Sequence, residues 1–285
     1  MRKSLLALAV LGTLNSGLTY AEEAAPAAKE EKPSYTLAYN VGLFSQYIFR
    51  GLTQTDSSPA LQGGVDFTHD SGFYVGAWGS NVSWPTDAIG EADSGSKYYS
   101  SGGSLEIDVY GGYRTELGKT GISLDVGLLQ YYYPGRKVSG GPGLNTTEAY
   151  GALSYGWLQA KYSQVISNDA WGFGTYKSDG EKLGNNADGT YYAELNATIP
   201  VGELIKTPYL SGVTAMAHYG RQEFDGKANE HASYSDYKLG VQKAFDNGVN
   251  VGAYWTKAIA SDTNWTYDGD NIGRSTGTFY LQKTF

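Results

Sequence analysis

The stretch YTLAYNVGLFSQYIFR, residues 35–50, alternates large apolar residues with small or polar ones. Its apolar set falls on odd positions and comprises Tyr35, Leu37, Tyr39, Val41, Leu43, Tyr47 and Phe49. Since successive strand residues point to opposite faces, the pattern predicts one apolar and one polar face. A strand over 35–50 would exceed the roughly 5–6 residues usual in soluble sheets, and a tilted transmembrane strand needs only about 9–11.

The same alternation recurs along the chain and predicts twelve strands. We expect them near residues 35–50, 60–69, 73–82, 104–114, 122–133, 147–155, 157–166, 190–199, 208–222, 234–245, 249–259 and 274–285. The connections alternate between short turns, such as the one at Asn247-Gly248, and long polar loops. The sequence therefore predicts an all-β fold, a transmembrane antiparallel β-barrel of about 12 strands with short periplasmic turns and long extracellular loops. A soluble β-sandwich would leave the asymmetry of the loops unexplained.

The N-terminus has the features of a secretory signal peptide. Arg2 and Lys3 precede an apolar core at 5–14, and small residues end the segment at Ala21. About ten apolar residues are too few for a helix that spans a bilayer. We therefore expect a cleaved signal peptide at 1–21, a disordered periplasmic tail at 22–33 and an outer-membrane barrel at 34–285. The expected location is the outer membrane of a Gram-negative bacterium, with outer-membrane lipid around the barrel.

The composition agrees with strands and turns and excludes several functions. Among the 285 residues are 39 glycines and 25 tyrosines, which disfavour long helices. The chain has no cysteine, which excludes a disulfide scaffold, thiolate metal sites and a cysteine nucleophile. The formal net charge of -8 argues against a nucleic-acid partner, which would call for a basic surface. We expect no cofactor and no metal site.

The last strand carries a candidate outer-membrane assembly signal. Phe279, Leu281 and the terminal Phe285 share one face of that strand, and we expect this face to be recognised by the outer-membrane barrel assembly machinery. Lys283 lies on the same face, at a position where an apolar residue is usual. Near the edge of the membrane its amine could reach water.

Four stretches carry a family resemblance: YIFRGLTQTD at 47–56, PALQGGVDF at 59–67, SGFY at 71–74 and WGSNV at 78–82. In these stretches, and in weaker echoes that run to Phe285, the chain resembles the TorF family of porin-like outer-membrane proteins, also catalogued as Gcw-chp proteins. The resemblance implies an outer-membrane barrel with a pore function, and it implies no particular substrate. Gln46 and Ile48 stand where the family pattern usually has Asp and Arg, so no pore charge is carried over to these two positions.

The polar face of the strands supplies the candidate pore-lining residues. They are Arg50, Asp66, Glu106, Asp108, Arg114, Asp125, Glu148, Lys161, Glu194, Asp236 and Lys238. Seven acids against four bases predict a weak preference for cations, because charges that line a pore bias which ions enter. We also expect Val109 to face lipid and the next residue, Tyr110, to face water in the lumen. Twelve strands leave open whether the lumen is a narrow pore or is closed by paired side chains.

Three functions remain open after these observations. The first is a porin-like ion channel for passive transport of small polar solutes or ions. The second is a structural or adhesive barrel with a plugged lumen. The third is a barrel lipid hydrolase built around His218, the one histidine placed in a strand, although the chain has no G-x-S-x-G motif. We predict that the protein is not an enzyme and assign no catalytic residue.

Overall fold

The computed structural model describes residues 33–87, 98–137, 143–173, 187–226, 230–267 and 269–285. The signal peptide expected at 1–21 lies outside the described residues, as does the expected tail at 22–33 except for Pro33. Among the described residues, no helix is long and apolar enough to cross a membrane.

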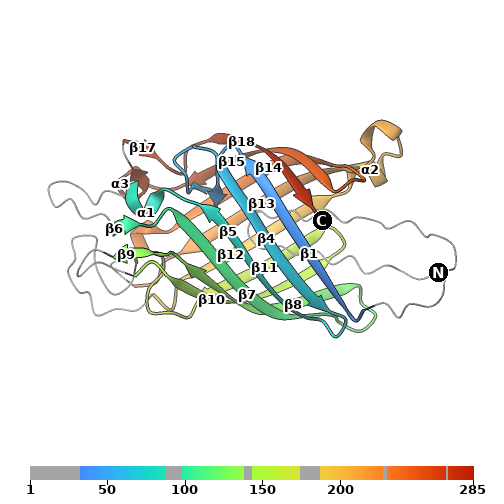
Figure 1. Ribbon diagram of the computed structural model, residues 1–285, viewed down its shortest axis with the longest axis horizontal. Helices are drawn as coiled ribbons and strands as arrows, with labels where there is room; N and C mark the ends of the chain where they lie inside the picture. Colours follow the sequence, from blue (N-terminus) through green and yellow to red (C-terminus); the bar gives the residue numbers. More distant parts are fainter. Residues whose placement is uncertain (1–32, 88–97, 138–142, 174–186, 227–229, 268) are drawn as a thin grey trace.

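Twelve antiparallel strands of the described chain close into a barrel, as the alternation predicts. In sequence order they are β1 (Tyr35–Phe44), β4 (Ala60–His69), β5 (Phe73–Asn81), β7 (Leu105–Glu116), β8 (Ile122–Tyr132), β10 (Thr146–Tyr155), β11 (Leu158–Val165), β12 (Tyr191–Ile199), β13 (Val213–Glu223), β14 (Tyr234–Ala244), β15 (Val249–Ile259) and β18 (Thr276–Thr284). Each strand pairs with its neighbours along the chain, and β1 pairs with β18 to close the ring. The strands cross the barrel obliquely (Figure 1).

The outer surface of the barrel is apolar. On β1 the residues Tyr35, Leu37, Tyr39, Val41 and Leu43 are each 43–60% exposed, and every other wall strand has at least one exposed large apolar residue. Such a surface is much larger than the scattered apolar patches that soluble monomers expose. The strands are also about as long as those that cross a bilayer, which need roughly 9–11 residues. Alternation therefore sets the facing of the wall strands as the sequence predicts.

The opposite register points into the barrel and forms the packed interior. Its apolar part is aromatic: Phe44 stacks on Tyr280 with ring centroids 5.1 Å apart, and Trp78 meets Tyr47, which lies beyond the end of β1, edge-on at 5.4 Å. Tyr110 belongs to this interior, which corrects the expectation that it faces water. It is buried, and its hydroxyl donates to Asp66.

The two ends of the barrel differ, as the lengths of the connections predict. At the short-turn end the strands are joined through 70–72, 117–121, 156–157, 200–212 and 245–248. At the long-loop end lie the small elements α1 (Trp84–Asp87), β6 (Tyr99–Gly102), β9 (Gly135–Lys137), η2 (Glu230–Ala232), α3 (Asp262–Trp265), β16 (Thr266–Tyr267) and β17 (Asp270–Asn271). Figure 1 shows α1, α3, β6, β9 and β17 gathered at this end.

One of the turns expected to be short is longer than the sequence pattern indicates. The connection 200–212 contains α2 (Val201–Leu204) and η1 (Pro208–Leu210), so β13 begins at Val213 and not at 208. Pro208 lacks a backbone N–H, which disfavours a ladder position in the sheet interior. Figure 1 shows α2 projecting beyond the short-turn end.

The terminal strand closes the barrel with its apolar face outward. Phe279, Leu281 and Phe285 are exposed on the outer surface, and the backbone N–H of Phe285 donates to the carbonyl of Tyr39 at 2.9 Å. The amine of Lys283 bends to the carbonyl of Asn247 in the neighbouring turn. The assembly role of the three apolar residues stays a prediction.

Candidate functional site: the lumen and its inserted hairpin

The first wall strand ends at Phe44, and the next residues form a small hairpin. The sequence predicted a strand over 35–50, but the Ser45 amide binds the Phe279 carbonyl at 2.8 Å and the chain then leaves the wall. The hairpin consists of β2 (Ile48–Phe49) and β3 (Leu52–Thr53). Its base is closed by a hydrogen bond from the backbone N–H of Gln54 to the carbonyl of Tyr47, at 2.8 Å. Alternation alone missed it because the apolar residues keep their period of two through the bend.

The hairpin turns at Arg50 and Gly51, which both have positive φ angles, 46° and 79°. Gly51 has no room for a side chain, because a Cβ atom there would collide with the Cβ of Asp236 and lie 3.1 Å from that of Ala258. A glycine supplies both the left-handed backbone and the close approach to the wall. The tip of the hairpin therefore packs against β14 and β15 in the interior of the barrel.

Arg50 fixes the tip of the hairpin to the opposite wall. Its Nη2 donates to both carboxylate oxygens of Glu148, at 2.9 and 2.8 Å, and its Nη1 donates to Gln222 at 2.8 Å. The guanidinium also lies 4.3 Å from the ring centroid of Tyr192 and 5.2 Å from that of Trp171. An arginine fork with a planar carboxylate partner gives a strong, directional contact. The sequence placed Arg50 on a wall strand, but it enters the lumen from this hairpin.

The remaining acids near the hairpin are deeply buried. Glu106 and Glu148 are each only 1% exposed, and Asp108 is 9% exposed. Tyr47 donates its hydroxyl to Glu106 at 2.7 Å, and Tyr131 donates to Glu148 at 3.0 Å. Among the described residues, Oδ1 of Asp108 has no hydrogen-bond partner. The long-loop half of the lumen is thus filled by paired polar side chains and by the hairpin.

A second ion pair lies toward the short-turn end. Arg114 binds Asp125 at 2.7 Å, and Tyr74 donates to the same carboxylate at 2.5 Å. Tyr74 also hydrogen-bonds to Tyr150, whose ring lies 4.5 Å from the amine of Lys161. These contacts link β5, β7, β8, β10 and β11 across their inward faces.

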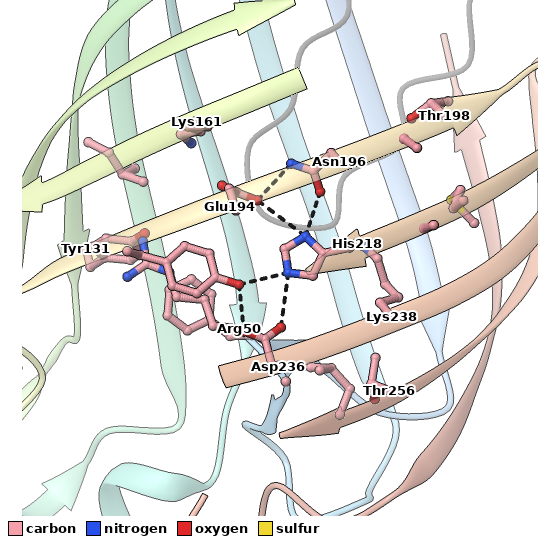
Figure 2. A pocket seen from close by; sticks show the side chains of 18 residues that line it. Arg50, Tyr131, Lys161, Glu194, Asn196, Thr198, His218, Asp236, Lys238 and Thr256 are labelled. Atoms are coloured by element: carbon pink, nitrogen blue, oxygen red, sulfur yellow. Dashed lines mark hydrogen bonds and ion pairs between the residues drawn. The ribbon is translucent and has the colours of Figure 1, made fainter. Parts of the chain in front are cut away.

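A polar cluster centred on His218 spans the neighbouring strands β12, β13 and β14 (Figure 2). Nδ1 of His218 lies 2.6 Å from Oδ1 of Asn196 and 3.5 Å from Oε2 of Glu194, and Nε2 of His218 lies 3.1 Å from Oδ1 of Asp236. Tyr192 donates to Asp236 at 2.7 Å and lies 2.8 Å from Nε2 of His218. Each ring nitrogen of His218 therefore faces one carboxylate.

This cluster lines a cavity beneath the hairpin, which we call the charged cavity. It contains about 850 Å³ of space, part of it open to solvent, and its lining includes Arg50, Lys161, Glu194, His218, Asp236 and Lys238. Figure 2 shows these side chains around one space, with His218 between Glu194 and Asp236. Thr198 and Thr256 line the same cavity. The charged cavity has room for several waters.

The structure places the sequence-predicted lumen residues as follows. Arg50 lies on the hairpin, and the other ten lie on wall strands with their side chains pointing inward. These ten are Asp66, Glu106, Asp108, Arg114, Asp125, Glu148, Lys161, Glu194, Asp236 and Lys238. Only Arg50, Lys161, Glu194, Asp236 and Lys238 meet at the charged cavity. Their lining of a conducting pore stays a prediction.

Sequence reasoning missed several residues of this arrangement. His218 was treated as an isolated strand histidine, although it pairs in register with Asn196 and Lys238. Gln222 and Tyr131 were not predicted to face the lumen, because their contacts there depend on where the hairpin folds. The Arg50-Gly51 dipeptide, with a glycine suited to a turn, was the one signal that could have located the hairpin.

Comparison with known proteins identifies a family and similar barrels. Residues 28–285 match the family model described as "Bacterial protein of unknown function (Gcw_chp)". No curated protein matches the chain. Among solved structures, the fold is similar to a KdgM porin (TM-score 0.48, 8% identity, 87% of this chain and 98% of that chain) and a NanC porin (TM-score 0.49, 10% identity, 88% and 99%). It is also similar to the outer membrane protein opdK from Pseudomonas aeruginosa (TM-score 0.40, 12% identity, 90% and 67%).

Proposed function

The chain belongs to the Gcw_chp family of bacterial proteins of unknown function, and we propose that it is a narrow outer-membrane channel for passive diffusion of small polar solutes or ions. The observation that carries this proposal is the charged cavity, which lies inside a closed barrel with an apolar outer surface. A polar interior within an apolar wall is the arrangement that lets polar solutes pass a bilayer.

The inserted hairpin supplies the constriction of this channel. It lies on the long-loop side of the charged cavity, and its residues Phe49, Arg50 and Gly51 form part of the cavity lining. A solute that entered from the long-loop end would have to pass the Arg50–Glu148 pair. Small displacements of the hairpin would therefore control the width of the path.

We further propose the weak cation preference that the count of charges predicts. Arg50 and Arg114 neutralise Glu148 and Asp125 in ion pairs, whereas Glu106 and Asp108 lie together and form no ion pair with a base in the described part of the chain. Field lines between low-dielectric walls strengthen the effect of such charges, and salt weakens it. Reversal potentials across a salt gradient test this for the wild type and for Glu106→Gln with Asp108→Asn. Anion preference in the wild type would contradict the proposal.

Solute passage itself is tested by liposome swelling. Purified protein in liposomes should admit arabinose faster than glucose and exclude raffinose, because the constriction selects by size. Liposomes that contain heat-denatured protein are the control. Swelling that does not depend on solute size, or equals the control for every solute, would argue against a narrow channel.

A second candidate is a structural or adhesive barrel with a plugged lumen. The near-complete burial of Glu106 and Glu148 around the hairpin favours it, since both carboxylates are shielded from the solvent-accessible surface. This candidate predicts no solute entry at any size, so the swelling assay separates the two functions.

A lipid hydrolase centred on His218 has less support. His218 lies in the lumen, on the opposite side of the wall from the lipid-facing surface. Its partners are Tyr192, Asn196, Glu194 and Asp236, none of which has the serine hydroxyl of a Ser-His nucleophile pair. We therefore propose a non-enzymatic role.

A further inference from the structure

A second cavity lies on the long-loop side of the hairpin, and we call it the aromatic cavity. It contains about 480 Å³ of space, part of it open to solvent, and eight of its twelve lining residues are aromatic. Phe49 lines both this cavity and the charged cavity, so the hairpin separates the two. The rings come from the hairpin, from α1, α3 and β16, from the first residue of β14, and from loop residues that follow β11 and β13.

The aromatic rings of this cavity are spaced as in favourable aromatic packing. Phe173 lies 4.4 Å from Phe224 and 5.8 Å from Trp265 between ring centroids, and both pairs are tilted. Aromatic pairs prefer offset or edge-to-face contacts at about 4.5–7 Å. A further planar ring can therefore add contacts of the same kind.

The polar character of the lining decides the chemistry of the occupant. None of the twelve lining residues carries a formal charge at neutral pH. The side-chain amide of Gln222 already accepts a hydrogen bond from Arg50 and donates one to the Tyr191 carbonyl. The side-chain amide of Gln54 donates to the Leu52 carbonyl. A sugar or an ion would lose most of its hydrogen bonds to water here, because the lining offers few polar partners, and the cost in free energy would be high, whereas an aromatic ring would lose little.

Two of the tryptophans in the lining have a buried indole N–H without an acceptor among the described residues. Nε1 of Trp84 and Nε1 of Trp171 are buried and have no hydrogen-bond partner among the described residues, whereas Nε1 of Trp265 donates to the Ala232 carbonyl at 2.9 Å. Trp84 as a whole is 8% exposed. Buried donors are normally paired, so the lining favours an occupant that carries an oxygen acceptor.

We propose that the aromatic cavity binds a small, uncharged, planar aromatic molecule with an oxygen acceptor, of the phenol class. The ring packs among Phe173, Phe224 and Trp265, and the oxygen accepts from an indole N–H of Trp84 or Trp171 once that buried group turns toward the cavity. This site is separate from the charged cavity, and binding does not depend on whether the barrel conducts.

The test is a fluorine NMR titration of 4-fluorophenol with the full-length barrel in lipid nanodiscs. We expect a saturable shift that phenol reverses and that glucose and benzoate leave unchanged. Phe173→Ala removes a ring from the lining, and Ile272→Trp fills the space without removing one. Each should weaken binding about tenfold. Trp255→Leu removes a ring from the lipid-facing surface and should bind as the wild type does.

Each outcome of the titration decides the proposal. The absence of a saturable shift, equal binding in Ile272→Trp and wild type, or displacement by glucose as readily as by phenol would overturn it. Heat-modifiable migration on gels verifies that each variant is folded, and Ile272→Trp keeps the test valid if Phe173→Ala does not fold. Binding without any conductance would refute the proposed channel while supporting this site.

Discussion

Arg50 and Glu148 stand 98 residues apart in sequence and form a buried, two-pronged ion pair inside the barrel, with Nη2 of Arg50 at 2.9 and 2.8 Å from the two carboxylate oxygens. The arginine side chain is 8% exposed and the glutamate side chain 1%. Because Arg50 sits at the tip of the hairpin, this pair helps to hold the hairpin against the wall, together with the bond from Arg50 to Gln222.

Replacing one partner of the pair should destabilise the protein far more than replacing both partners. Arg50→Met leaves Glu148 as an uncompensated buried charge, and we expect a loss of about 3–5 kcal/mol in the free energy of unfolding. Arg50→Met with Glu148→Leu should recover most of that loss. Urea titration followed by tryptophan fluorescence measures both. Arg221→Met is the matched control, because Arg221 and Glu223 pair at 40% and 36% exposure and such pairs contribute at most about 1 kcal/mol. Equal losses for Arg50→Met and Arg221→Met would contradict this account.

Gly51→Ala should displace the hairpin. A non-glycine residue in the left-handed region costs roughly 1–2 kcal/mol, and the added Cβ also collides with Asp236. Gly156→Ala separates the two effects, because Gly156 has φ 59° but nothing within 4 Å of the added atom. We expect Gly51→Ala to lower the unfolding midpoint more than Gly156→Ala. Identical midpoints would mean that the tip of the hairpin is not packed against the wall.

A charged side chain on the outer surface should lower the free energy of unfolding most near the middle of the membrane. Val109 is 48% exposed in the middle of β7, and we expect Val109→Lys to lower the free energy of unfolding by roughly 2–4 kcal/mol. Ile259→Lys places the same charge at the long-loop end of β15, where the cost should fall to about 0–1 kcal/mol. Unfolding in lipid vesicles measures both. A similar cost at the two positions would argue against a membrane-spanning barrel.

Loss of Phe285 should impair assembly. Deletion removes an exposed aromatic ring and the backbone pair that Phe285 makes with Tyr39 at the seam of the barrel. We expect less folded, heat-modifiable protein in the outer membrane. Phe285→Leu keeps the backbone pair and isolates the contribution of the ring. Normal assembly of the deletion variant would count against a recognition role for the terminal residue.

The facing of the wall residues could be predicted because it depends only on neighbours in the sequence. A period of two fixes which side chains face lipid, and the alternation of Leu105, Ile107 and Val109 with Glu106 and Asp108 survives intact in β7. Pro208 marks the limit of that rule, because the alternation around it is weak and the segment folds into η1.

The site was less predictable because it depends on contacts between distant segments. Ser45, Tyr47 and Phe49 continue the period of β1, so no local signal separates wall from hairpin except the turn at Arg50-Gly51. The sequence left open whether the lumen charges pair with one another, and the partner of Arg50 follows only from where its hairpin folds. Twelve strands leave a lumen narrow enough for such a segment to fill.

The most direct test is single-channel conductance in planar bilayers, for the wild type and for a variant in which Asn-Gly replaces residues 48–53. The Gln54 amide binds the Tyr47 carbonyl at 2.8 Å, so a two-residue turn can bridge the cut. The account predicts small conductance steps in the wild type and clearly larger steps in the shortened variant. The same small steps in both would contradict a constriction at the hairpin, and no steps in either would contradict a channel.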